Sequence, residues 1–210
     1  MKDYVKESQS HFDKQAETYD SNTSLNYSGA GKVSCADAEE FLSDFNYNNL
    51  LDVGCGTGFL IDNLAAKKDA EYHGLDLSEK MIEVAESKNI KNAHFKQGLA
   101  DCLPYEDNSF DVVTCIQSFH HYPDSDKAMK EAYRVLKPGG LYLLSDTGVS
   151  GIAGWVENNI IFKLLKSGDC HIENRHDIAD RMRRNGFTDI CDKQIKGFIY
   201  TVVGYKPDAE

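Results

Sequence analysis

Hydrophobic and polar positions change their spacing along this chain. From Asn49 onward, short apolar runs typical of buried strands alternate with stretches that carry one apolar face at helical spacing. The runs predicted as strands are Asn49–Val53, Glu71–Asp76, Ala93–Lys96, Phe110–Ile116 and Leu141–Ser145. The helices predicted between them run from a glycine-rich turn to about Lys67, from a cap at Ser78, and from Asp124 to Leu136 before Lys-Pro-Gly-Gly. Because parallel neighbours must be joined by crossovers, this alternation predicts a parallel sheet.

The last part of the chain predicts two more helices and a hairpin. The helices lie near Ile152–Lys166 and His176–Asn185, and the strands Phe187–Lys193 and Phe198–Tyr205 pair around a Lys-Gly turn. The hairpin makes the final strand antiparallel to the others. We therefore expect an α/β fold: a doubly wound, mostly parallel seven-stranded sheet with helices on both faces. Such sheets bind ligands at the carboxyl ends of their strands, where the strand order reverses.

The first 45 residues are predicted to be helical, with a break around Asn22–Gly31 where Ser, Asn and Gly cluster. We interpret 1–210 as one domain, with 1–45 as a helical lid segment and 46–210 as a Rossmann-like core. Two interpretations of the first helix stay open. It closes over the crevice as a lid carrying Tyr19 and Tyr27, or it is docked on the core without a gating role.

Three alternating glycines follow the first predicted strand. Gly54, Gly56 and Gly58 allow positive φ and let a ligand approach the backbone without a Cβ in the way. The dinucleotide fingerprint G-x-G-x-x-G requires a glycine where this chain has Phe59. Asp52, two residues before the turn, suits a ligand with positive charge and disfavours a pyrophosphate.

The second predicted strand ends at Asp76, 22 residues after Gly54. At this interval an acidic residue meets the hydroxyls of a ribose. Its two carboxylate oxygens are able to accept from both vicinal hydroxyls. Alternatively, Asp76 binds no ligand and only stabilises the N-terminus of the following helix through the helix dipole.

Net charge and cysteine spacing limit the possible partners and the cellular location of the protein. With 34 acidic and 23 basic residues, the formal net charge is −11, which disfavours nucleic acid as a partner. No apolar run approaches the roughly 20 residues of a membrane-spanning helix, and the charged N-terminus does not resemble a signal peptide. The six cysteines lie far apart, which favours a reducing, cytoplasmic location.

The motifs together resemble the class I S-adenosylmethionine-dependent methyltransferases, in particular the small-molecule branch that includes quinone-biosynthesis enzymes. The matching segments are His11-Phe-Asp13…Ala16…Tyr19-Asp20, Leu51-Asp-Val-Gly-Cys-Gly-Thr-Gly58, Gly74-Leu-Asp76-Leu-Ser78, Gln97–Asp111 and Arg134-Val-Leu-Lys-Pro-Gly-Gly140. They occur in the family's order over nearly the whole chain.

The resemblance implies that S-adenosylmethionine is the cofactor and that its parts lie along the strand ends. The residues implied to bind it are Tyr19, Asp52, Gly54, Cys55, Gly56, Thr57, Gly58, Asp76, Leu77, Met81, Leu99, Ala100, Asp101, Ile116 and Gln117. The family often has an acid directly after the loop glycine, where this chain has Leu99. Asp101 is expected to take over recognition of the adenine edge. Tyr19 is implied to lie by the transferable methyl group.

Methyl transfer to an acceptor that must lose a proton needs a base, and His120 and His121 follow the fourth predicted strand. Either histidine has an alternative role as a core residue bonded to a backbone carbonyl. We predict no metal site, because no third His or Cys lies at a recognisable spacing from this pair. Trp155 and the apolar helix Ile160–Leu165 line an acceptor pocket or cover the sheet.

The predicted function is methylation of a small-molecule acceptor at carbon, nitrogen or oxygen. Gln117-Ser-Phe-His120 stands where nucleic-acid methyltransferases carry an Asn/Asp-Pro-Pro-aromatic tetrapeptide, which again disfavours nucleic acid. Two alternatives are a non-catalytic S-adenosylmethionine-binding protein and a NAD(P)-dependent oxidoreductase. The sequence leaves the oligomeric state open.

Overall fold

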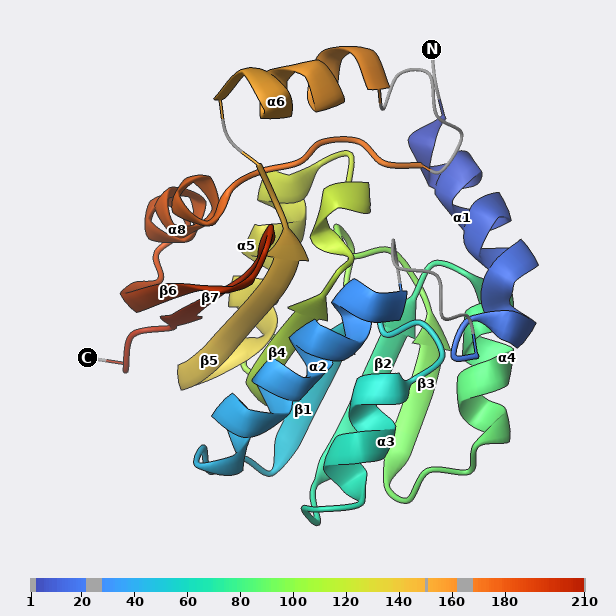
Figure 1. Ribbon diagram of the computed structural model, residues 1–210. Helices are drawn as coiled ribbons and strands as arrows, with labels where there is room; N and C mark the ends of the chain where they lie inside the picture. Colours follow the sequence, from blue (N-terminus) through green and yellow to red (C-terminus); the bar gives the residue numbers. More distant parts are fainter. Residues whose placement is uncertain (1–2, 22–27, 150, 162–167, 210) are drawn as a thin grey trace.

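The computed structural model describes residues 3–21, 28–149, 151–161 and 168–209. Its centre is a seven-stranded sheet with the order β3-β2-β1-β4-β5-β7-β6 (Figure 1). The strands are β1 Asn49–Val53, β2 Glu71–Asp76, β3 Ala93–Gln97, β4 Phe110–Ile116, β5 Leu136–Thr147, β6 Thr188–Lys196 and β7 Ile199–Tyr205. All neighbours from β3 to β5 pair in parallel, and β7 is antiparallel to both β5 and β6. The predicted fold class is confirmed.

Helices cover both faces of the sheet (Figure 1). They are α1 Tyr4–Gln15, α2 Ser28–Ser43, α3 Phe59–Ala65, α4 Glu79–Ser87, α5 Ser125–Val135, α6 Gly151–Val156 and α8 Arg175–Arg184, with the short turns η1 Ala16–Thr18, η2 Phe119–His121 and η3 Glu157–Ile161. Successive strand residues point to opposite faces. Leu50 of β1 therefore packs in one core cluster with α2 and α3, while Leu51 packs in the other with α5 and α8.

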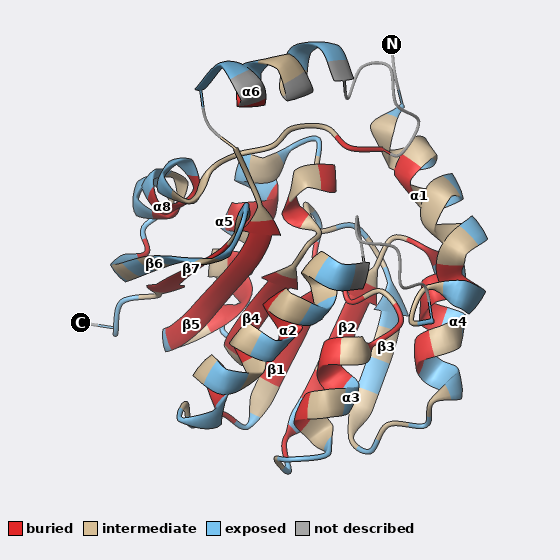
Figure 2. Ribbon diagram, in the orientation of Figure 1, coloured by how far each residue is buried: buried red, intermediate tan, exposed pale blue. Residues whose placement is uncertain are grey.

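Burial follows the sheet order. Strands β1 and β4 and residues 140–146 of β5 are almost entirely buried, whereas the edge strand β3 is mostly exposed (Figure 2). The central strands lie between two helical layers, and this explains why they are continuous apolar runs. Within the described residues, no helix combines the length and apolarity that crossing a membrane requires.

The transition from α5 to β5 differs from the prediction. The helix ends at Val135 as its stop signal indicates, but β5 begins at once with Leu136, before the glycines. Leu136 pairs with Phe110, and the register then shifts, so Lys-Pro-Gly-Gly forms an irregularity inside the strand. Gly139 adopts φ 73°, which a glycine accommodates without strain.

The predicted helix near Ile152–Lys166 is shorter in the described residues. It consists of α6, which continues as a π-helical turn, η3. Residues 162–167 and the predicted lid residue Tyr27 lie outside the described residues.

The N-terminal segment lies against the carboxyl-end side of the sheet beside α4 (Figure 1). The Ser78 hydroxyl, which caps α4 by accepting from the Met81 backbone N–H at 3.1 Å, donates to the Asp13 carboxylate at 2.6 Å. The Thr57 hydroxyl donates to Asp20 at 2.6 Å, and the Lys88 ammonium lies 2.8 Å from the same carboxylate. These polar contacts join the segment to the glycine turn and to both ends of α4.

Candidate active site

A pocket opens at the carboxyl ends of β1, β2 and β4, where the sheet order reverses. The cavity has a volume of about 150 Å³. The glycine turn, the end of β2, the segment after β3, the end of β4 and the N-terminal helix all contribute to its lining. The site is therefore where doubly wound sheets place their ligands.

The three glycines of the turn serve different purposes. All have positive φ, with values of 77°, 53° and 74° at Gly54, Gly56 and Gly58. A Cβ at Gly54 would collide with the Ser118 side chain, and one at Gly58 would lie 2.9 Å from the Phe95 ring. A Cβ at Gly56 would have no atom within 4 Å, and Gly56 lines the pocket. Two of the glycines thus allow close packing, and the middle one leaves room for a ligand.

Asp76 stands at the tip of β2 and holds the glycine turn in place. One carboxylate oxygen accepts from the Gly56 backbone N–H at 2.8 Å, and the other accepts from the Ser78 N–H at 2.8 Å. Burial raises the pKa of this carboxyl, although both hydrogen bonds oppose the effect. Each oxygen keeps a further lone pair for a hydroxyl donor in the pocket.

Asp52 lies at the base of the pocket and is only 2% exposed. The Thr114 hydroxyl donates to it at 2.7 Å. Burial raises the pKa of Asp52 to about 7; the Thr114 hydrogen bond opposes this, and the Asp76 charge adds to it. A cationic ligand group in the pocket would stabilise the ionised form, so this carboxylate favours a positively charged ligand.

Most of the predicted cofactor residues line this one pocket. These are Tyr19, Asp52, Gly54, Cys55, Gly56, Thr57, Asp76, Leu77, Met81, Leu99, Ala100, Ile116 and Gln117. Gly58 and Asp101 are not among its lining residues. Gly58 is the left-handed N-cap of α3, and the Asp101 carboxylate lies 3.3 Å from the Lys127 ammonium.

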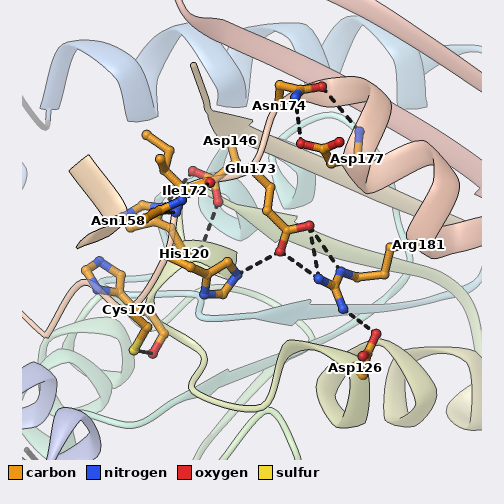
Figure 3. Close-up of polar contacts among 12 residues, drawn as sticks. His120, Asp126, Asp146, Asn158, Cys170, Ile172, Glu173, Asn174, Asp177 and Arg181 are labelled. Carbon is orange, nitrogen blue, oxygen red and sulfur yellow. Dashed lines mark hydrogen bonds and ion pairs between the residues drawn. The ribbon is translucent and has the colours of Figure 1, made fainter. Parts of the chain in front are cut away.

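The two predicted histidines have different surroundings, although their ring centroids lie only 4.1 Å apart. His121 lines the pocket and packs edge-on against Phe12 of α1, with ring centroids 5.0 Å apart. His120 does not line the pocket, and its Nδ1 lies 2.7 Å from the Asp146 carboxylate at the end of β5 (Figure 3). The two rings leave the short η2 turn side by side, and only His121 borders the pocket.

The electrostatic environments of the two rings are opposite. Burial disfavours the charged form of His120, but the Asp146 carboxylate outweighs this, so the pKa of His120 is raised. Burial and the neighbouring His120 lower the pKa of His121 well below its usual range, against the effect of the Asp169 carboxylate. His121 is therefore neutral at physiological pH and presents an uncharged imidazole to the pocket.

Trp155 and Ile160 do not line the pocket. They are 60% and 47% exposed on α6 and η3, respectively, so the described part of this segment presents apolar side chains to solvent. Residues 162–165 of the predicted apolar helix lie outside the described residues.

Sequence reasoning missed several residues of the site. Asp146 lies at the end of a strand, as Asp52 and Asp76 do, and the same rule would have singled it out. Asp169, 3% exposed, approaches both histidines from a segment without regular structure, where no periodic signal marks it. Tyr122 fixes the turn by donating to the Val53 carbonyl at 3.2 Å.

Comparison with known proteins agrees with this arrangement. Residues 51–144 match a protein family described as methyltransferase domain. An uncharacterized methyltransferase of Bacillus subtilis (strain 168), YcgJ, is 40% identical over 103 residues, which are 47% of this chain and 40% of that protein. A demethylmenaquinone methyltransferase of Listeria welshimeri is 41% identical over 113 residues, which are 51% of this chain and 48% of that enzyme. The chain thus spans less than half the length of these two curated relatives.

A solved structure extends the likeness over the whole fold. Phosphoethanolamine N-methyltransferase 2 of Haemonchus contortus, in complex with phosphomonomethylethanolamine and S-adenosylhomocysteine, superposes with a TM-score of 0.79. The superposition covers 99% of this chain and 61% of that one at 19% identity. At this identity the likeness concerns the fold.

Proposed function

We propose, on the premise that this chain belongs to the class I S-adenosylmethionine-dependent methyltransferases, that it transfers the methyl group of S-adenosylmethionine to a small organic acceptor. The observation that carries the proposal is the pocket itself. A backbone turn with open space above Gly56 lies between two buried carboxylates, Asp52 and Asp76. This combination suits a ligand that has both a cationic end and a pair of ribose hydroxyls.

The proposed binding mode follows the lining of the pocket. Asp52 and the turn from Gly54 to Thr57 hold the methionine portion, and Asp76 holds the ribose. Leu77, Met81, Leu99 and Ala100 enclose the adenine, and these four side chains supply an apolar surface for a flat ring. Asp101 is paired with Lys127, so we assign the adenine contact to Leu99 and Ala100 rather than to it.

S-adenosylmethionine supplies an activated methyl group, and the acceptor's electron pair forms the new bond as the carbon–sulfur bond breaks and its pair stays on sulfur. The protein's contribution is to align the acceptor and exclude water, and such positioning supplies roughly 7–11 kcal/mol of a barrier. Tyr19 and His121 border the pocket at the end of η1 and in η2, and we propose that they position the acceptor. The segment 1–45 then acts as a lid of a single domain.

A small, largely apolar acceptor fits the surroundings best. Val5 and Phe12 of α1 and Ile116 of β4 add apolar surface to the pocket. The relative that methylates demethylmenaquinone, by its name, supports an organic acceptor of this class. The net charge of −11 disfavours nucleic acid, and a cytoplasmic location stays a prediction.

Calorimetry with S-adenosylmethionine tests the cofactor site. We expect Asp76→Ala to lower the affinity at least tenfold, because two acceptors for ribose hydroxyls are lost. Asp101→Ala is the matched control and should bind like the parent chain. Equal affinity of both variants would contradict the assignment, and tighter binding of NAD(P)H would favour an oxidoreductase.

Methyl transfer is tested with isotopically labelled S-adenosylmethionine and a panel of small acceptors that includes demethylmenaquinone. Formation of S-adenosylhomocysteine together with a labelled product that extracts into organic solvent is the expected result. Binding of the cofactor without product for any acceptor would favour the non-catalytic alternative.

A further inference from the structure

Three potential metal ligands converge beside the pocket. His120 and His121 come from η2, and Asp169 comes from the segment before α8. Nε2 of His120 lies 3.6 Å from the Asp169 carboxylate, and Nδ1 of His121 lies 3.4 Å from the same oxygen. One ligand atom from each residue lies within 4.8 Å of the others. All three side chains are shielded from solvent.

These separations match the spacing of ligands around a metal ion. Two ligands bound at about 2.1 Å with a tetrahedral angle lie about 3.4 Å apart. The distances of 3.4 and 3.6 Å are longer than ordinary hydrogen bonds and close to this value. All three ligand atoms lie within 4.8 Å of one another, so the widest pair would close by at most about 1.4 Å around one ion.

Asp146 makes the hydrogen bond that a histidine ligand usually has at the ring nitrogen that does not bind the metal. It engages Nδ1 of His120 at 2.7 Å (Figure 3). It also accepts from the Thr147 backbone N–H at 2.7 Å. The opposite nitrogen, Nε2, is the one that faces Asp169. A carboxylate bonded to one imidazole nitrogen fixes the ring and raises the basicity of the other nitrogen as a ligand.

The buried imidazole of His121 is a second, independent indication of a ligand at this place. It is 7% exposed, and neither of its ring nitrogens makes a hydrogen bond of good geometry within the described residues, although the Asp169 carboxylate, 3.4 Å from Nδ1, and the Gly168 backbone face the ring. A buried imidazole normally satisfies at least one nitrogen. The deeply buried carboxylates Asp146 and Asp169, together with two imidazoles, provide the charge and donor set that a divalent ion requires.

We propose that His120, His121 and Asp169 bind one divalent transition-metal ion, with Zn²⁺ as the best match, next to the acceptor end of the pocket. Two imidazoles and a carboxylate are a common donor set for Zn²⁺ and leave a coordination position open. His121 lines the pocket, so that position lies within reach of a bound acceptor.

If the chain is a methyltransferase as proposed, a metal ion at this place favours acceptors that carry a hydroxyl or a thiol. An acceptor hydroxyl or thiol that binds the ion loses its proton to solvent more readily, because the metal stabilises the anion. The anionic oxygen or sulfur then takes the methyl carbon, and the electron pair of the broken bond remains on the departing sulfur. The sequence argument against a metal considered only His and Cys spacing and could not include Asp169.

Metal binding is tested on the full chain without cofactor. After treatment with a chelator, the protein is dialysed against buffered Zn²⁺, and bound metal is measured by mass spectrometry. We expect one ion per chain, and at least a tenfold loss of affinity in His120→Ala and Asp169→Asn. His176→Ala removes an exposed histidine and is the matched control, which should bind like the parent. Asp146→Asn should weaken binding about 10–100-fold without removing a ligand.

Two further measurements separate folding from metal binding. Zn²⁺ should raise the melting temperature of the parent chain and of His176→Ala, but not that of His120→Ala. S-adenosylmethionine affinity should be unchanged in His120→Ala, because His120 does not line the pocket. Absence of stoichiometric Zn²⁺ binding, or equal binding by His120→Ala, would overturn the inference and leave the cluster as a hydrogen-bonded network. Loss of cofactor binding in the parent chain would instead overturn the proposed function.

Discussion

Replacing Asp52 with Asn should make the protein more stable and its cofactor binding weaker. The Asp52 carboxyl is buried, and its pKa is raised from an ordinary value of 3.8 to about 7. At about 1.4 kcal/mol per pH unit, this difference corresponds to a cost of about 4 kcal/mol when the group is ionised in the folded chain. Asn has nearly the same shape and keeps an acceptor for the Thr114 hydroxyl.

The pH dependence follows from the direction of this change. Because the pKa is raised on folding, the native state keeps a proton that the unfolded state has released between pH 3.8 and about 7. Stability is therefore lost as the pH rises through this window, and the loss is complete above about pH 7. Asp52→Asn removes the loss, so its gain in stability should be largest, up to about 4 kcal/mol, at about pH 8 and nearly absent at about pH 4.

Urea unfolding of the ligand-free chain at several pH values, followed by circular dichroism, measures this effect. Asp44→Asn, at an exposed position, is the control and should show no such trend. In calorimetry, Asp52→Asn should lose roughly 10–150-fold in affinity for S-adenosylmethionine, since a charged hydrogen bond contributes about 1.5–3 kcal/mol. A variant that is less stable than the parent at about pH 8, or that binds equally well, would refute the reasoning.

Three further substitutions separate packing from binding. Gly54→Ala should lower the unfolding midpoint more than Gly56→Ala, because both positions have positive φ but only the Gly54 Cβ meets the Ser118 side chain. Gly56→Ala should also weaken cofactor binding, because its Cβ enters open space in the pocket; equal losses of midpoint in the two variants would contradict this division. Ser78→Ala should destabilise the chain by about 1 kcal/mol in urea unfolding through the lost helix cap, and an unchanged midpoint would speak against the cap. Asp20→Asn removes the ion pair with Lys88, so stopped-flow measurements should show faster cofactor release; an unchanged rate would favour a docked helix without a gating role.

The sequence predicted the sheet well because its signals are local. Strands β1, β2 and β4 have the predicted bounds, since each is a buried run followed by a turn with its own chemistry. Asp52 and Asp76 could be placed for the same reason, because the ends of neighbouring parallel strands meet at one edge.

Features set by tertiary contacts could not be predicted in this way. The choice between His120 and His121 depends on how the side chains leave a short turn, which no periodic pattern encodes. Asp101 stays a prediction for the adenine edge; it does not line the pocket, and its carboxylate lies 3.3 Å from the Lys127 ammonium of α5, a tertiary contact that no local pattern encodes. Asp169 reaches the histidines only because the chain returns across the strand ends after β5.

The exposed position of Trp155 has a practical consequence for spectroscopy. It is the one tryptophan in the sequence and is 60% exposed on α6, outside the lining of the pocket. Its indole already meets water in the native chain, so its emission spectrum should change little when the core unfolds. Fluorescence excited at the indole band will accordingly report events at α6, such as its contact with another molecule.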